Sequence, residues 1–371
     1  MRIGIDARFI GPQGTGLGVY TQNLVENLQK IDKKNDYFIF LKQDNWSYLK
    51  LTSFNFTKVL ADIPWYSLAE QTKMSALLKS KNLNLVHFPH FNVPILYRKK
   101  FVVTIHDLIH KHSPHTITST KNSLIFRLKR FGFNKVLNHA LNNSSKIIAP
   151  SNYVKEDIMK SFKIDPQKIS VTHEAAEVEY FASNRSTIND KRLTILYVGN
   201  AYPHKNLEKL LEAIAFLKNN FKFQISNFKL LIVCPRDVFS KRLEHLIKEK
   251  NLQNRVDLLG YKKAKDLASL FRKSSAYVCP SLWEGFGIPG LNAMASQIPL
   301  ICSNIPTFKE IYGDAAIYFN PNDPVDIAQK IKHVLTSKKT RLGLVERGKK
   351  QVKNYSWQKM AKQTLRIYQA S

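Results

Sequence analysis

Two segments in the first half of this 371-residue sequence place chemistry-bearing residues directly after apolar runs. The first, GPQGTGLGVYTQNL, carries Gly14, Gly16 and Gly18 between the run RIGID and a helical pattern. A glycine-rich turn ahead of a helix brings bare backbone amides close to an anion or to sugar hydroxyls. A simple tight turn would use the same residues. The spacing is not the strict dinucleotide fingerprint, and no acidic residue closes the second expected strand, which argues against a nicotinamide cofactor.

The second segment, VVTIHDL, puts His106 and Asp107 at the end of an apolar run. A single histidine is often a satisfied core residue. A His-Asp pair at the carboxyl end of a buried strand, however, lies where open parallel sheets bind their ligands. The pattern therefore makes His106 a candidate functional residue.

A third segment, LYVGNAYPHKNLEKLLEA, places Lys205 at the start of a helix that begins near Asn206. Gly199 and Asn200 close the strand before it. An ammonium at a helix N-terminus can share one phosphate group with the helix dipole. This placement favours a phosphate-binding role over that of one more surface lysine.

The fourth segment, CPSLWEGFGIPGLNAMA, is the most specific one. Glu284 follows an apolar run and is flanked by Gly285, Phe286 and Gly287. Glycines let backbone amides approach a ligand closely, and a carboxylate accepts hydrogen bonds from sugar hydroxyls. The helix expected to open near Pro289 would point its positive end at a bound phosphate.

The elements that must position these residues alternate between short apolar runs and helical patterns. Strands are expected at 2–6, 36–41, 84–88, 101–105, 146–149, 193–199, 228–233, 256–260, 276–279, 299–302 and 316–319, and the clearest helices of the first half at 17–30, 67–79 and 121–142. Apolar strands with crossover helices indicate parallel sheets that are buried on both faces. The predicted fold class is α/β, with two doubly wound, Rossmann-like parallel-sheet domains facing across a cleft.

The expected domain boundaries follow from composition. Residues 1–181 form the N-terminal domain, the polar stretch 182–192 is the linker, and 193–355 form the C-terminal domain. The residue pattern of the tail 356–371 predicts an amphipathic helix. No stretch approaches the roughly 20 apolar residues that span a bilayer, and the start lacks a signal-peptide pattern, so a cytoplasmic location is expected.

Composition narrows the function classes. The hydrophobic share of 44% excludes a mainly disordered chain. The 57 Lys and Arg against 28 Asp and Glu give a net charge of +29, which favours polyanionic partners such as nucleic acid, anionic membranes or phosphorylated small molecules. The cysteines Cys234, Cys279 and Cys302 each end an apolar run and are expected to be reduced and buried rather than metal ligands.

Taken together and in this order, the motifs resemble the retaining glycosyltransferases of glycosyltransferase family 4, which have the GT-B fold. The resemblance covers essentially the whole chain and includes 147–158, 198–206, 280–295 and the closing helix. VGNAYPHKN looks most like bacterial mannosyltransferases that build surface polysaccharides, such as O-antigen, from GDP-mannose. The resemblance implies that the C-terminal domain binds the nucleotide-sugar, that the N-terminal domain binds the acceptor, and that the last helix packs back on the N-terminal domain.

The resemblance also implies roles for single residues. Glu284 would be the first glutamate of an E-x7-E motif and would hold donor-sugar hydroxyls, while Lys205 would neutralise the diphosphate. His106 would touch the transferred sugar. The N-terminal glycine loop, Gly16 above all, would face the diphosphate and the acceptor. The implied donor-binding set is Gly199, Asn200, Gly285, Phe286, Gly287 and Asn292.

Two positions depart from the family pattern. Asn292 replaces the second glutamate of the motif, which usually binds the ribose hydroxyls, and so loses a charge-assisted contact. Asn200 stands where many relatives carry an arginine. The chain has no Asp-x-Asp sequence, so no metal cofactor is expected, and lysine, amides and helix dipoles must stabilise the departing nucleoside diphosphate.

The stretch between Asp107 and Glu156 contains no acidic residue. Its helix should bury a stripe formed by Leu124, Ile125, Leu128 and Phe131. The opposite face would then present Phe126, Lys129, Arg130 and Phe133. Aromatic and cationic side chains on one outward face suit an anionic bilayer, so peripheral attachment to the inner face of the cytoplasmic membrane is expected. A solvated basic face is the alternative.

Four hypotheses about the function of the protein remain open at this point. The first is a hexosyltransferase, with GDP-mannose as the expected donor and a lipid-linked saccharide as the expected acceptor. The second is a basic nucleic-acid-binding protein, although no recognition motif is present and specific binding is not expected. The third is a family member in which Asn292 marks lost catalysis. The fourth is another GT-B enzyme, such as a sugar-nucleotide epimerase.

Overall fold

The structure, a computed structural model, describes residues 1–11, 14–112, 123–181, 193–220 and 227–371, with only the backbone described for 123–129. These residues form two compact units. The first contains 1–108, the described part of 117–174 and Ser356–Ser371, and the second contains Ala175–Tyr355 with the short helix α3 (Ile109–His112). The expected linker, 182–192, lies outside the described residues.

The first unit is built on a parallel sheet of seven strands in the order β3-β2-β1-β4-β5-β6-β7. Its strands are β1 (Arg2–Asp6), β2 (Asp36–Leu41), β3 (Phe56–Leu60), β4 (Leu85–Phe88), β5 (Phe101–Thr104), β6 (Lys146–Ala149) and β7 (Ile169–Val171). The central strands β4 and β5 are buried along their whole length, because helices cover both faces of the sheet.

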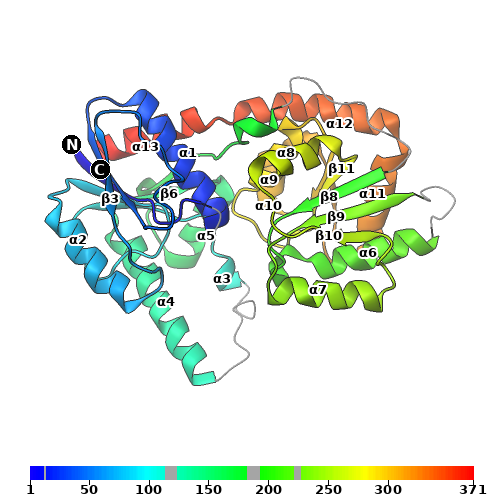
Figure 1. Cartoon of the computed structure of the whole chain (residues 1–371), viewed down its shortest axis with the longest axis horizontal. Helices are drawn as coiled ribbons and strands as arrows, with labels where there is room; N and C mark the ends of the chain where they lie inside the picture. Colours follow the sequence, from blue (N-terminus) through cyan, green and yellow to red (C-terminus); the bar gives the residue numbers. More distant parts are fainter. Residues whose placement is uncertain (12–13, 113–122, 182–192, 221–226) are drawn as a thin grey trace. The chain divides into compact units, whose positions relative to one another are not determined.

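The helices of this unit are α1 (Thr15–Ile31), α2 (Ser75–Ser80), α4 (Ser123–Asn143), α5 (Asn152–Phe162) and α13 (Trp357–Ala370). The C-terminal helix α13 lies beside α1, at the opposite end of the sequence (Figure 1). Buried Trp357, Met360 and Tyr368 give α13 its apolar face.

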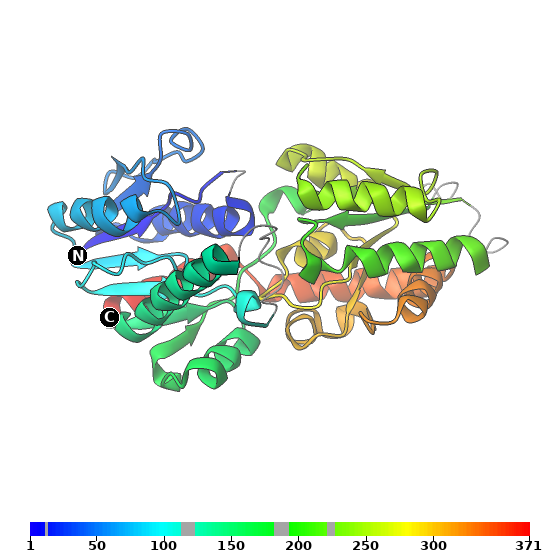
Figure 2. The ribbon, with the colours of Figure 1, turned by 90° about the horizontal axis from the view of Figure 1, so that it is seen from below.

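The second unit is a parallel sheet of six strands in the order β10-β9-β8-β11-β12-β13. Its strands are β8 (Leu193–Val198), β9 (Phe228–Val233), β10 (Val256–Leu258), β11 (Ala276–Cys279), β12 (Leu300–Ser303) and β13 (Ala316–Phe319). Its helices are α6 (Leu207–Asn220), α7 (Val238–Glu249), α8 (Ala264–Lys273), α9 (Ile288–Ala295), α10 (Pro306–Tyr312), α11 (Pro324–Thr336) and α12 (Lys338–Gln351). Helices α6 and α7 lie side by side on the same face of the sheet, as Figure 2 also shows.

Two strands of the structure were not predicted from the sequence, and both lie at edges of the first sheet. β3 (Phe56–Leu60) alternates buried and exposed residues, and β7 (Ile169–Val171) is only three residues long. Edge strands need no continuous apolar run, so the pattern that revealed the central strands did not reveal these. The helix expected at 67–79 instead begins as a π-helical turn, Glu70–Met74.

The second unit begins at Ala175, six residues before the expected end of the N-terminal domain at residue 181. The reason is packing: Ala176 and Tyr180 belong to the hydrophobic core of the second unit. The Ser296 hydroxyl also donates a hydrogen bond to the Tyr180 carbonyl at 3.2 Å. The segment that follows β7 is therefore part of the second unit.

The orientation expected for helix α4 is wrong where side chains are described. Phe131, expected in the core, is 59% exposed, and the Lys135 ammonium lies 4.5 Å from its ring centre. Phe133, expected outside, is half-buried and packs edge-on against Phe91 with ring centroids 4.9 Å apart. Arg130 is exposed, as expected, while the side chains of Phe126 and Lys129 lie outside the described residues. The buried stripe is set by Leu137, Ala140 and Leu141 in the last turns of the helix.

Candidate functional site

The second sheet brings Lys205 and Glu284 together. Strand β8 leads to Lys205 and strand β11 leads to Glu284, and these strands are neighbours at the point where the strand order reverses. Such a switch point leaves a crevice at the carboxyl ends of the strands, where open α/β sheets bind ligands. The Lys205 Nζ lies 2.6 Å from the Glu284 Oε1, and both side chains are mostly buried, at 17% and 15% exposed.

Further hydrogen bonds fix the position of Glu284. The Ser281 hydroxyl donates to Glu284 Oε1 at 2.7 Å, and the Thr307 hydroxyl donates to the Glu284 carbonyl at 2.7 Å. Burial acts to raise the pKa of the Glu284 carboxyl, but the Lys205 ammonium, the nearby His204 and the hydrogen bond from Ser281 outweigh burial and hold that pKa below its ordinary value. Glu284 is therefore an ionised hydrogen-bond acceptor at neutral pH.

The glycine loop after Glu284 is shaped by a tyrosine that the sequence did not single out. Gly287 has φ +99°, a conformation that favours glycine. The Tyr312 hydroxyl donates to the Gly287 carbonyl at 2.6 Å, and a Cβ on Gly287 or Gly290 would overlap that hydroxyl. The Phe286 side chain is 3% exposed and packs against Tyr355, so this residue can offer a ligand only its backbone.

The loop after β8 is similarly constrained. Gly199 has φ +154°, and a Cβ there would come within 2.8 Å of the Tyr197 hydroxyl. That hydroxyl donates to the Asn200 carbonyl at 2.8 Å. Lys205 then ends a 3-10 turn, Pro203–Lys205, and the Asn206 amide ties this loop to the Pro280 and Pro321 carbonyls.

Asn292 lies in α9, is 4% exposed and pairs with Glu177. Its Oδ1 accepts a hydrogen bond from the Glu177 backbone N–H at 3.1 Å. Its Nδ2 donates to the Glu177 carboxylate at 3.3 Å. Glu177 was not a candidate in the sequence, because it follows the short edge strand β7.

In the first unit, both ring nitrogens of His106 are bonded to the protein. Nδ1 lies 2.9 Å from the Glu174 Oε1, and Nε2 lies 2.9 Å from the Pro89 carbonyl oxygen. A carbonyl oxygen only accepts hydrogen bonds, so Nε2 donates to Pro89, and Nδ1 is occupied by the Glu174 carboxyl group. The ring lies at the carboxyl end of β5, and a sugar could approach His106 only through the carbon edge of the ring unless a bond to Glu174 or Pro89 breaks.

The three N-terminal glycines differ in their surroundings. A Cβ on Gly14 would overlap the Phe9 carbonyl, and one on Gly18 would come within 2.7 Å of that same oxygen. Among the described residues, and leaving aside the chain neighbours of Gly16 and the backbone of α1 itself, no atom lies within 4 Å of the position a Cβ would take on Gly16. Close packing therefore accounts for glycine at 14 and 18, whereas no described contact requires glycine at 16.

A buried ionic network, also missed in the sequence, lies beneath the loops at this edge of the first sheet. Arg8 is fully buried and bonds to both carboxylate oxygens of Asp6, at 2.8 and 2.7 Å, and to the Glu70 Oε1 at 2.6 Å. Glu70 also accepts from the Asn92 amide at 2.7 Å. The network ties β1 to the loops after β3 and β4, and spacing along the sequence gave no sign that Arg8 and Glu70 would meet.

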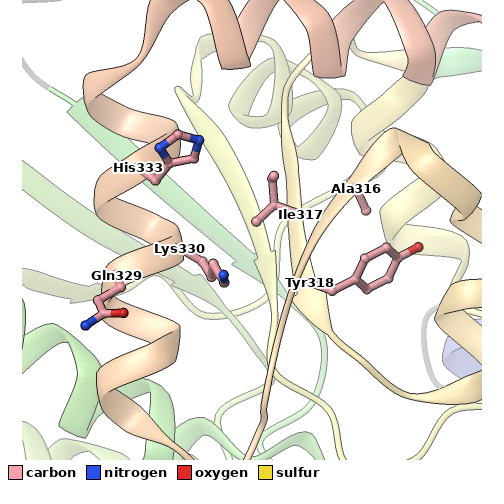
Figure 3. Close-up of a pocket in the computed structure, with 6 residues that line it drawn as sticks. All are labelled: Ala316, Ile317, Tyr318, Gln329, Lys330 and His333. Carbon is pink, nitrogen blue, oxygen red and sulfur yellow. The ribbon is translucent and has the colours of Figure 1, made fainter.

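Other features bear on the expectations without adding a site. Cys234, Cys279 and Cys302 are free and buried, as expected. Among the described residues, no group of three or more His, Cys, Asp or Glu is placed to hold a metal ion, and no helix is long and apolar enough to cross a membrane. An open pocket of about 540 Å³ lies between β13 and α11 and is lined by Ala316, Ile317, Tyr318, Gln329, Lys330 and His333, none of which belongs to the motifs (Figure 3).

Comparison with solved structures supports the two-domain architecture. The chain superposes over its full length on a sucrose-phosphate synthase from Thermosynechococcus elongatus, covering 98% of that protein with a TM-score of 0.79 at 19% identity. WaaG, a glycosyltransferase involved in lipopolysaccharide biosynthesis, gives a TM-score of 0.75 at 13% identity, with 99% of each chain covered. These similarities establish the GT-B fold.

Comparison of sequences gives the family. Residues 14–180 match the family described as "Glycosyltransferase Family 4", and residues 180–351 match "Glycosyl transferases group 1". The chain is 28% identical to the O-antigen chain mannosyltransferase RfbU of Salmonella typhimurium over 340 residues, which cover 88% of each protein. It is 25% identical to the O-antigen chain mannosyltransferase B of Escherichia coli, over 82% of this chain and 78% of the relative. The chain therefore belongs to the group 1, family 4 glycosyltransferases and has their GT-B fold.

Proposed function

We propose that this glycosyltransferase transfers a hexose, mannose from GDP-mannose, to a lipid-linked saccharide in the synthesis of a cell-surface polysaccharide, with retention of the anomeric configuration. The observation that carries the proposal is the Lys205–Glu284 pair, 2.6 Å apart beside the glycine loop at the switch point of the second sheet. The names of the sequence relatives, which are O-antigen mannosyltransferases, support mannose as the transferred sugar.

The proposed chemistry assigns the two charges separate tasks. The bond between the anomeric carbon and the diphosphate breaks, and its electron pair goes to the phosphate oxygen. An ammonium has three N–H donors, so Lys205 can bond Glu284 and that oxygen together. Glu284 accepts hydrogen bonds from the sugar hydroxyls, and the amides of the glycine loop add dipoles toward the departing charge. The acceptor hydroxyl attacks from the same face, and its proton passes to the leaving phosphate oxygen.

Thermal-shift measurements with a panel of nucleotide-sugars test the donor. A ligand at 100 times its dissociation constant stabilises a protein by ~2.7 kcal/mol, which raises its melting temperature by several degrees. We expect GDP-mannose and GDP to produce this rise, and GMP, which lacks the diphosphate, to produce a much smaller one.

A matched pair of variants shows whether the site is the one described. Lys205→Ala should lose most of the GDP-dependent shift, while Lys209→Ala, which removes a more exposed lysine on α6, should keep it. A panel in which no nucleoside diphosphate or nucleotide-sugar stabilises the protein would count against the proposal, and a larger shift with another nucleotide-sugar would replace GDP-mannose as the donor.

We also propose that helix α4 docks on an anionic membrane surface, where a lipid-linked acceptor would be found. The outward side of the described part of α4 carries Phe131, which is 59% exposed, with Lys135 above its ring. Exposed Arg130 adds positive charge. An exposed aromatic ring among cations is suited to the interface of a negatively charged bilayer.

Liposome flotation with anionic lipids measures this docking. Phe131→Ser/Lys135→Glu should reduce the fraction of protein that floats, because it removes the aromatic ring and reverses one charge. The control, Lys248→Glu, makes the same change of charge on an exposed position of α7 in the second unit. Equal flotation of the two variants would exclude this face of α4.

A further inference from the structure

A second carboxylate, that of Glu177, lies next to the glycine loop and its helix. Glu177 is half-buried and belongs to the second unit, like Glu284. Both polar atoms of the Asn292 amide bond to Glu177, one to its backbone N–H and one to its carboxylate. Because Asn292 is 4% exposed within α9, this double contact fixes the Glu177 carboxylate against that helix.

The two carboxylates differ in their charge partners. Glu284 is neutralised by Lys205, whereas no cation lies within ion-pair distance of Glu177 in the part of the chain that the structure describes. Burial raises the pKa of the Glu177 carboxyl, and the hydrogen bond from Asn292 offsets this only in part. A half-buried carboxylate without a counter-charge is costly, and it gains most from a ligand that brings hydrogen-bond donors.

The position of Glu177 suggests which donors those are. Asn292 lies four residues beyond the first residue of α9, which corresponds to about 6 Å along the helix axis. A diphosphate held at the start of α9 and the glycine loop would therefore have its attached ribose at the level of Asn292. A carboxylate repels phosphate, but its two oxygens accept from the paired hydroxyls of a ribose.

We propose that Glu177 binds the 2′ and 3′ hydroxyls of the donor's ribose and is held in place for this by Asn292. The proposal rests on the proposed function, because it assumes a nucleoside diphosphate in the second unit. In this proposal, Glu177 supplies the carboxylate that position 292 lacks. Asn292 is then a positioning residue. A glutamate at position 292 would repel the Glu177 carboxylate, whereas the neutral Asn292 amide lets that carboxylate lie against α9.

Calorimetric titration with GDP and with 2′,3′-dideoxy-GDP tests this contact, and UDP with its dideoxy analogue serves as a second pair. The wild-type protein should bind the ribose form at least ~10-fold more tightly than the dideoxy form, as expected for hydrogen bonds to a charged group. Glu177→Ala should bind the two forms within about threefold of each other, because the partner of the hydroxyls is gone. Glu177→Gln, which keeps the shape of the side chain, should show an intermediate ratio.

The control variant is Glu179→Gln, which neutralises an exposed carboxylate two residues further along. It should keep the wild-type ratio of affinities. The double variant Glu177→Gln/Asn292→Glu moves the carboxylate from residue 177 to residue 292. Compared with the single variant Glu177→Gln, it should regain discrimination against the dideoxy form. Melting temperatures show that each variant is folded.

The outcomes separate this inference from the proposed function. If Glu177→Ala binds GDP or UDP but still discriminates against the dideoxy form as strongly as wild type does, Glu177 does not bind the ribose. The inference is also contradicted if the folded double variant binds the ribose and dideoxy forms equally. If the wild-type protein binds neither GDP nor UDP, the proposed function itself fails and this inference fails with it.

Discussion

Glu284→Ala should lower the rate of sugar transfer at least ~100-fold, the scale on which a well-oriented electrostatic contact at a reacting centre acts. The variant removes the acceptor of sugar hydroxyls and also the partner that holds the Lys205 ammonium, 2.6 Å away. Release of nucleoside diphosphate from the donor identified by thermal shift, measured with and without acceptor, gives the rate.

The control for this prediction is Glu346→Gln, which neutralises an exposed glutamate of α12. It should transfer sugar at the wild-type rate. Glu284→Gln should fall between wild type and alanine, because an amide still bonds hydroxyls but does not hold the ammonium as strongly. Turnover of the folded Glu284→Ala variant within a few-fold of wild type would show that Glu284 is not at the reacting centre.

Arg8→Met should reduce the free energy of unfolding of the first unit by about 3–5 kcal/mol, because it leaves two buried carboxylates without their shared counter-charge. Asp6 is 2% exposed and Glu70 is fully buried, so water cannot replace the guanidinium. Methionine matches the length of the arginine stem, which limits the loss of packing. Calorimetric melting of the whole chain measures the effect, since a two-unit protein need not unfold in one step.

The dependence of this effect on pH identifies its cause. Burial already raises the pKa of Glu70 although Arg8 opposes it, so the pKa should rise further without Arg8. A carboxyl with a raised pKa binds more protons in the folded state, and the stability of the Arg8→Met variant should fall as pH rises from 4 to 7. Arg98→Met, at an exposed position, should change the unfolding free energy by less than ~0.5 kcal/mol. A small loss of stability for Arg8→Met with no pH dependence would contradict an uncompensated charge.

The residues next to the central strands could be predicted from the sequence because their signal is local. Lys205 and Glu284 each follow a continuous apolar run, and the carboxyl ends of parallel strands meet at one edge of a sheet. The expectation that both lie at a ligand-binding edge therefore needed no knowledge of which strands are neighbours. Their direct pairing did need it, because it depends on β8 and β11 being adjacent.

Helix α4 shows where local pattern fails. Phe131 and Phe133 are both aromatic and lie among cations, so composition could not say which one faces the core. The answer came from the packing of Phe133 on Phe91, a residue more than forty positions earlier. An amphipathic pattern fixes a helix but leaves its rotation open when both faces carry apolar side chains.

By itself, the sequence determined the two parallel-sheet domains and the loops that carry His106, Lys205 and Glu284, because buried strands and glycine turns leave marks within a few residues. Only the tertiary structure decided that Glu174 and Pro89 bond His106, that Arg8 meets Glu70, and that Asn292 holds Glu177. Each of these contacts joins segments 17 to 115 residues apart. Polar pairing over such distances depends on strand order and burial, which no short pattern of residue types specifies.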